Sequence, residues 1–134
     1  MANILKVEGI GISYRDKLRK TGIRSTKTLL RKGATPQARK DLAKKSGISD
    51  ALILKWVNHA DLFRIKGVAE EYSDLLEASG VDTVVELAQR NADKLIQTIV
   101  KTNQTKKLVR KLPTEKQVAD WIRQAKKLPR AIQY

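Results

Sequence analysis

The sequence predicts an all-α protein, and three observations support that prediction. Apolar residues recur at helical spacing in segments of 8 to 14 residues. Glycine, serine and threonine separate these segments at positions where helices begin and end. Sustained alternation of apolar and polar residues, which a half-buried strand requires, is missing from the sequence. The chain should therefore fold as helices joined by short turns.

The first half should contain a short helix or extended arm followed by four helices. Gly22 and Gly47 follow two of these helices and should stop them in the left-handed conformation that glycine adopts readily. Thr35 and Pro36 form a threonine N-cap followed by proline at the first helical position. The expected segments are residues 4–8, 13–21, 25 or 26 through 32, 37–46 and 50–60, the last capped by Ser49 and carrying Trp56 on its core face.

The second half should follow the same course. Thr83 with Glu86, and Thr114 with Gln117, have the spacing of capping boxes. The expected helices are residues 69–79, a short one after Thr83, 93–102 and 114–127, with a basic, partly apolar segment at 106–112 and a tail from Pro129 to Tyr134. The helix with Trp121 should correspond to the helix with Trp56.

An internal repeat organises the chain. The pattern of residues 7–32 returns 58 positions later within residues 65–91, and the match includes glycines, tyrosines, aspartates and leucines at a constant offset. The matched pairs are Gly9 with Gly67, Tyr14 with Tyr72, Asp16 with Asp74, Leu18 with Leu76, Gly22 with Gly80, and Leu29 with Leu87. Two tandem units, residues 1–62 and 63–134, should pack into one compact domain, with an insertion in the second near residues 103–113.

The charge of the chain predicts a polyanionic partner. The formal net charge is +14, from 28 basic and 14 acidic residues. Residues 1–62 carry 14 Lys/Arg against 5 Asp/Glu, residues 63–99 carry 4 against 7, and residues 100–134 carry 10 against 2. Two basic ends thus flank an acidic middle. An excess of this size favours nucleic acid over a merely solvated surface.

Other features narrow the function classes. The chain has no cysteine, which excludes disulfides and thiolate metal sites. His59 is the only histidine and should have a surface or helix-end role. Because nucleophile–base pairs, metal clusters and nucleotide-binding loops are missing from the sequence, we expect no enzyme, no cofactor and no metal. With neither a membrane-spanning stretch nor a signal peptide, we expect a cytoplasmic protein.

The candidate site is the segment Gly9-Ile10-Gly11. Ile10 can enter the core while the flanking glycines leave the backbone bare. A helix begins directly afterwards, so loop and first-turn N–H groups could point outward together and hold a phosphate. Lysine and arginine side chains could add charge-assisted contacts, of which Lys17 and Arg24 are the best placed. The alternative is a tight turn that binds nothing.

The stretch GIGISYRDKLRKTGIRSTKTLLRK resembles the helix-hairpin-helix motif and is similar to the hairpin segment of X-family repair DNA polymerases. With its tyrosine after each hairpin and its paired tryptophan helices, the chain from residue 4 to residue 128 resembles an uncharacterised bacterial family of tandem helix-hairpin-helix proteins. The resemblance implies a hairpin whose main chain holds a DNA phosphate without reading sequence. By position it assigns that contact to Gly9, Ile10 and Gly11, with Ile12, Ser13 and Arg15 beside them.

Two further regions have separate expectations. In the second hairpin Ala69 replaces the second glycine, and Glu70, Glu71 and Asp74 surround it. Carboxylates there would repel a phosphate, so this hairpin should be structural or bind a protein. The cations Lys106, Lys107, Arg110 and Lys111, with Lys101, could form a second nucleic-acid contact or a solvated loop.

The sequence therefore predicts sequence-independent binding of double-stranded DNA, or of structured RNA, and a nucleoid association if DNA is the partner. The alternative is a protein-interaction or self-assembling scaffold, because the acidic second hairpin of one molecule could meet a basic face of another.

Overall fold

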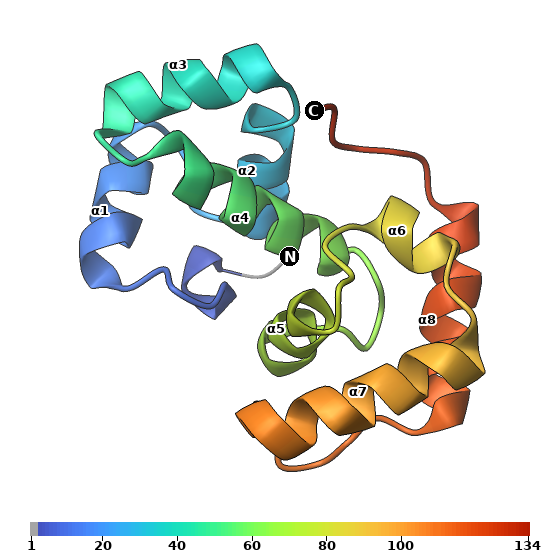
Figure 1. Ribbon diagram of the computed structural model, residues 1–134. Coiled ribbons are helices and arrows are strands. Elements are labelled where there is room, and N and C mark those ends of the chain that lie inside the picture. Colours follow the sequence, from blue (N-terminus) through green and yellow to red (C-terminus); the bar gives the residue numbers. More distant parts are fainter. Residues whose placement is uncertain (1–2) are drawn as a thin grey trace. The chain divides into compact units, whose positions relative to one another are not determined.

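The computed structural model describes residues 3–134 and is all-helical over that range (Figure 1). The prediction of an all-α fold is confirmed. The described elements are η1 (Ile4–Lys6), α1 (Ile12–Lys20), α2 (Thr26–Lys32), α3 (Pro36–Ser46), α4 (Asp50–Leu62), α5 (Glu70–Ala78), α6 (Val84–Ala88), α7 (Ala92–Lys106) and α8 (Glu115–Lys127). None of the described helices is both long and apolar enough to span a bilayer.

The chain divides into two compact units. Unit 1 contains the described residues up to Asp61 together with Arg130–Tyr134, and unit 2 contains Leu62–Pro129. From the sequence, the boundary was predicted one residue later, with the tail in the second half. The tail instead belongs to unit 1, because it packs against and hydrogen-bonds to residues of that unit.

Unit 1 buries the apolar residues of its five helices around Trp56 of α4. Trp56 is 1% exposed, and Tyr14 of α1 meets it edge-on with ring centroids 5.0 Å apart. Thr35 caps α3 as the sequence predicts, and Ser25, one of the two predicted candidates, caps α2. Each hydroxyl oxygen accepts a hydrogen bond from a backbone N–H group. The tryptophan therefore contributes to the core, where a ring of this size contributes most to stability.

The tail is an ordered part of unit 1. Ile132 is 2% exposed, the Gln133 N–H donates to the Ala34 carbonyl at 2.7 Å, and the Tyr134 hydroxyl donates to Asn58 Oδ1 at 3.0 Å. Arg39 of α3 is 4% exposed and donates to the carbonyls of Gly33 and Gln133, both at 2.9 Å. A buried arginine thus connects the α2–α3 turn to the end of the chain.

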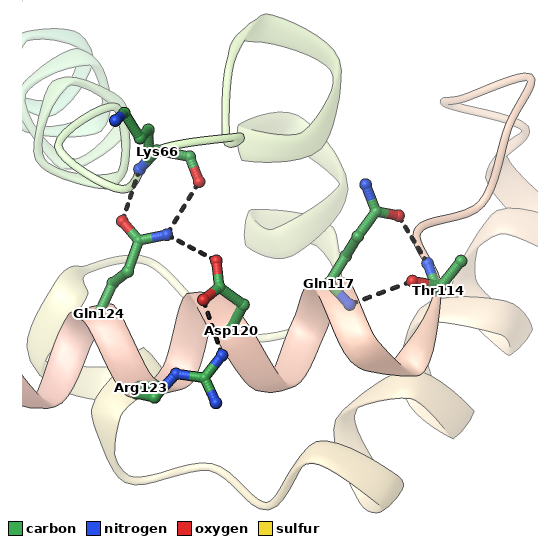
Figure 2. A network of polar contacts seen from close by, with 6 residues as sticks. All are labelled: Lys66, Thr114, Gln117, Asp120, Arg123 and Gln124. Carbon is green, nitrogen blue, oxygen red and sulfur yellow. Dashed lines mark hydrogen bonds and ion pairs between the residues drawn. The ribbon is translucent and has the colours of Figure 1, made fainter.

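Unit 2 buries its apolar residues around Trp121 of α8. Trp121 is 2% exposed and packs against Tyr72 of α5 with ring centroids 5.3 Å apart. Thr114 and Gln117 form the predicted reciprocal capping box at the start of α8 (Figure 2). The box predicted at Thr83 forms in part: Thr83 accepts from the Glu86 N–H, whereas the Glu86 carboxylate accepts from the Asp82 N–H.

Candidate nucleic-acid interface

In the first hairpin, the Ile10 side chain is buried in the core and the Trp56 indole lies close to Gly9. Gly9 has φ +91°, which side-chain-bearing residues rarely adopt. A Cβ at Gly9 would lie 3.3 Å from Trp56 Nε1. Ile10 is 4% exposed, so it enters the core as predicted. Its N–H, however, donates to the Val7 carbonyl at 3.1 Å. The expectation of an outward-pointing Ile10 amide is therefore wrong, because that amide closes the turn.

The backbone N–H groups without an acceptor belong to the residues that follow Ile10, at the start of α1. Gly11 is the N-cap, has ordinary extended angles and makes no side-chain capping bond. Within residues 3–134, the N–H groups of Gly11, Ile12 and Ser13 have no recorded acceptor, and all three residues are exposed. A Cβ at Gly11 would meet nothing within 4 Å. The described structure thus presents an uncapped helix N-terminus with free space in front of it.

The predicted side-chain helpers differ in their availability. Arg15 forms an ion pair with its neighbour Asp16 at 3.2 Å and is 22% exposed. The Lys17 ammonium lies 5.7 Å from the centre of the Tyr14 ring, a weak cation–π contact. Arg24 is exposed, in the turn before α2. Lys17 and Arg24 therefore remain candidates for an anion, whereas the charge of Arg15 is partly neutralised.

The second hairpin has the same backbone geometry but different chemistry. Gly67 has φ +99°, and a Cβ there would lie 3.1 Å from Trp121 Nε1. The Val68 N–H donates to the Ile65 carbonyl at 3.1 Å, as the Ile10 N–H does to Val7. Ala69 is the N-cap of α5, and Glu70 and Glu71 occupy its first turn. The carboxylates satisfy this helix end electrostatically, which disfavours an anion.

The turns after α1 and α5 also match. The Gly22 N–H donates to Arg19 and the Ile23 N–H to Leu18, which is the bonding of a Schellman motif. After α5, the Gly80 N–H donates to Glu77 and the Val81 N–H to Leu76. Each helix therefore ends at a left-handed glycine, as the sequence predicts.

A glutamine that the sequence analysis did not single out holds the second hairpin in place. Gln124 of α8 accepts from the Lys66 N–H at 2.8 Å and donates to the Lys66 carbonyl at 3.1 Å (Figure 2). It also donates to Asp120, whose carboxylate accepts from Arg123 at 2.8 Å. These hydrogen bonds from Arg123 and Gln124 lower the pKa of Asp120. On the same helix, a hydrogen bond and repulsion from Asp93 raise the pKa of Glu115.

The second basic cluster lies on an ordered loop. Lys106 ends α7, and Lys107 has φ 51°, the only positive φ outside glycine in the described chain. The Asn103 side chain accepts from the Val109 N–H at 3.0 Å and donates to the Val109 carbonyl at 3.1 Å. The Tyr72 hydroxyl donates to the Lys111 carbonyl at 3.0 Å. The loop backbone is thus fixed while Lys106, Lys107, Arg110 and Lys111 are exposed.

The predicted site residues fall into both units. The set from Gly9 to Arg24 lies in unit 1, and the set from Lys106 to Lys111 lies in unit 2. Within unit 1 the structure brings Gly9, Ile10, Gly11, Ser13 and Lys17 onto one hairpin and the helix it opens. Each set therefore belongs to the surface of its own unit.

His59 and Arg39 show where sequence reasoning fails for polar residues. For His59 the sequence predicted a surface or a helix-end position; the residue lies in the last turn of α4 but is 0% exposed, so only the helix-end alternative holds. Arg39 was not singled out as different from the surrounding lysines, yet it is 4% exposed. The burial of Arg39 has no local sequence signal, because its partner Gln133 lies 94 positions further along the chain.

The fold and these hairpins define an all-helical protein with two glycine turns, each lying against a tryptophan. The profile of one family, described as Domain of unknown function (DUF4332), matches residues 8–128. The chain belongs to this family. No curated protein and no solved structure matches the chain at a significant level.

Proposed function

We propose that unit 1 binds the phosphate backbone of double-stranded nucleic acid without sequence preference and without catalysis. The N-terminus of α1 is the centre of this interface, with Gly11, Ile12 and Ser13 as main-chain donors. Lys17 and Arg24 supply charge beside it, and Gly9 and Ile10 shape the turn. Duplex DNA is the primary candidate ligand, and structured RNA is the second candidate. The corresponding location is the cytoplasm, in association with the nucleoid.

The observation that carries the proposal is the open N-terminus of α1. Backbone N–H groups at a helix start attract anions through their partial positive charge. Gly11 adds no side chain that would block the approach. Main-chain donors contact phosphate without reading bases, which is why binding should not depend on sequence. The net charge of +14 adds a long-range attraction to any polyanion.

We further propose that the two hairpins are tandem helix-hairpin-helix repeats, of which only the first binds phosphate. The matching glycine angles, turn hydrogen bonds and tryptophan contacts support this interpretation. Glu70 and Glu71 distinguish the second hairpin. The cations Lys106, Lys107, Arg110 and Lys111 are proposed as additional phosphate contacts of unit 2.

Binding should weaken steeply with salt. If about five phosphates are neutralised, the logarithm of the association constant should fall with the logarithm of salt concentration at a slope of about −4 to −5. Fluorescence anisotropy with two short duplexes of unrelated sequence, between about 50 and 200 mM KCl, measures this slope. Equal affinities for the two duplexes are expected. A clear preference for one sequence would contradict backbone recognition.

Gly11→Val is expected to weaken binding to both duplexes by roughly tenfold or more, because hydrogen bonds to a charged group contribute about 1.5–3 kcal/mol. The valine side chain would fill the space in front of the free amides. Since these amides carry no net charge, the salt slope should hardly change, whereas Lys17→Ala should reduce it by about one.

Ala69→Val is the matched control, because Ala69 is the exposed N-cap of the second hairpin. It should leave duplex affinity unchanged. Equal effects of Gly11→Val and Ala69→Val would remove the first hairpin from the interface. If neither variant changes affinity but light scattering shows salt-dependent self-association, the acidic second hairpin and a scaffold role become the better explanation.

A further inference from the structure

The non-helical tail, residues 130–134, lies along the surface of unit 1 where the turn after α2 meets α4. Figure 1 shows this segment as the coil that ends the chain. It contacts Ala34 in the turn through the Gln133 N–H and Asn58 on α4 through the Tyr134 hydroxyl, and it buries Ile132. Unit 1 therefore holds a piece of non-helical chain by one main-chain hydrogen bond, by side-chain hydrogen bonds that involve Arg39 and Asn58, and by one buried apolar side chain.

Unit 2 has the corresponding surface, where the turn after α6 meets α8. Lys32 at the end of α2 donates to the Thr21 carbonyl at 2.9 Å, and Arg90 after α6 donates to the Gly80 carbonyl at 3.4 Å. Ala34 and Ala92 each follow that cation by two residues. Asn58 and Arg123 each follow the core tryptophan by two residues. Residues at matching positions of the two units thus form the two surfaces.

In unit 2 this surface is an open depression of about 320 Å³. Its lining includes Ala92 and Ile122, and three cations, Arg90, Arg123 and Lys126, surround these apolar side chains. The lining contains no carboxylate. Asp120, one turn away on α8, forms an ion pair with Arg123, which is 63% exposed (Figure 2). At the positions of Arg123 and Lys126 relative to the tryptophan, unit 1 has Asn58 and Asp61.

We propose that this depression of unit 2 binds an extended peptide segment that carries acidic side chains around one apolar residue. Unit 1 shows that such a surface holds non-helical chain, with an isoleucine as the buried side chain. The three cations determine the charge of the partner, because positively charged side chains around an apolar surface favour an acidic partner. The inference concerns a protein partner and does not depend on nucleic-acid binding by unit 1.

The test uses the full chain and a fluorescently labelled, end-capped peptide in which glutamates flank one isoleucine, with a glutamine counterpart. Fluorescence anisotropy should show binding of the glutamate peptide and at least roughly tenfold weaker binding of the glutamine peptide. The double variant Arg123→Gln/Lys126→Gln should weaken glutamate-peptide binding by roughly tenfold. The control Lys116→Gln/Lys127→Gln removes the same charge from the same helix outside the depression, and it should change affinity by less than about twofold.

Three results would overturn the proposal. First, the glutamate peptide could fail to bind. Second, the two double variants could weaken binding of the glutamate peptide equally. Third, Arg123→Gln/Lys126→Gln could weaken binding to duplex DNA while neither peptide binds. The second result would indicate general electrostatic attraction, and the third would assign the depression to nucleic acid. Because all four substituted side chains are exposed or line the surface, unchanged helical circular dichroism is expected for both variants.

Discussion

Replacing Arg39 by alanine is expected to lower the free energy of unfolding of unit 1 by about 3 kcal/mol. The guanidinium is buried and donates to two main-chain carbonyls, Gly33 and Gln133. Its removal leaves both carbonyls without this donor and also removes the packed aliphatic stem. The tail should then detach, because Gln133 loses its hydrogen bond to α3 and Tyr134 loses a cation 5.9 Å from its ring.

Urea unfolding followed by NMR measures this effect in each unit, since the indole N–H signals of Trp56 and Trp121 report units 1 and 2 separately. Lys40→Ala is the control, because Lys40 is the exposed neighbour of Arg39 on α3. It should change the free energy of unfolding by no more than about 0.5 kcal/mol. Equal effects of the two substitutions would show that Arg39 does not hold the tail.

Replacing Gly9 by valine is expected to destabilise unit 1 by about 3 kcal/mol, as the sum of two effects. A side chain at φ +91° is strained by about 1–2 kcal/mol, and more for a β-branched residue. The new side chain would also press on the indole of Trp56, since its Cβ alone lies 3.3 Å from Nε1. Overpacking of this kind adds about 1–3 kcal/mol.

Gly11→Val provides the control two residues away. Gly11 has extended backbone angles and open space around it, so the same change should alter stability by about 1 kcal/mol or less. Thermal unfolding of the two variants compares them directly. The pair separates folding from binding: Gly9→Val should disrupt the hairpin, and Gly11→Val should block only its outer surface. Similar losses of stability would contradict this division.

Much of the helical structure could be predicted because its signals are local. Ser25 and Thr35 cap their helices, Pro36 opens α3, and Gly22 and Gly80 end α1 and α5 in the left-handed conformation. A cap or a stop depends on the hydrogen bonds of the nearest turn, so the residues that make it are adjacent in the sequence. The boundaries of the α-helices accordingly agree with the predicted ones to within a few residues at most ends.

The candidate site was predicted less well, because the use of each amide depends on the fold of the turn. Gly9 and Gly11 look equivalent in the sequence, yet one lies against an indole and the other faces open space. The Ile10 N–H is taken by Val7, so the free donors are those of Gly11, Ile12 and Ser13. The residues of the hairpin could be identified from the sequence, but the direction of each N–H group depends on the tertiary structure.

By itself the sequence determined the all-helical class, the helix ends and the position of the first hairpin. Each of these follows from side-chain spacing or from the bonding of a single turn. Only the tertiary structure decided that Arg39 and His59 are buried, that the tail belongs to unit 1, and that Arg90, Arg123 and Lys126 line one depression. These features join residues far apart in the chain, and burial depends on what such distant segments cover rather than on any local pattern.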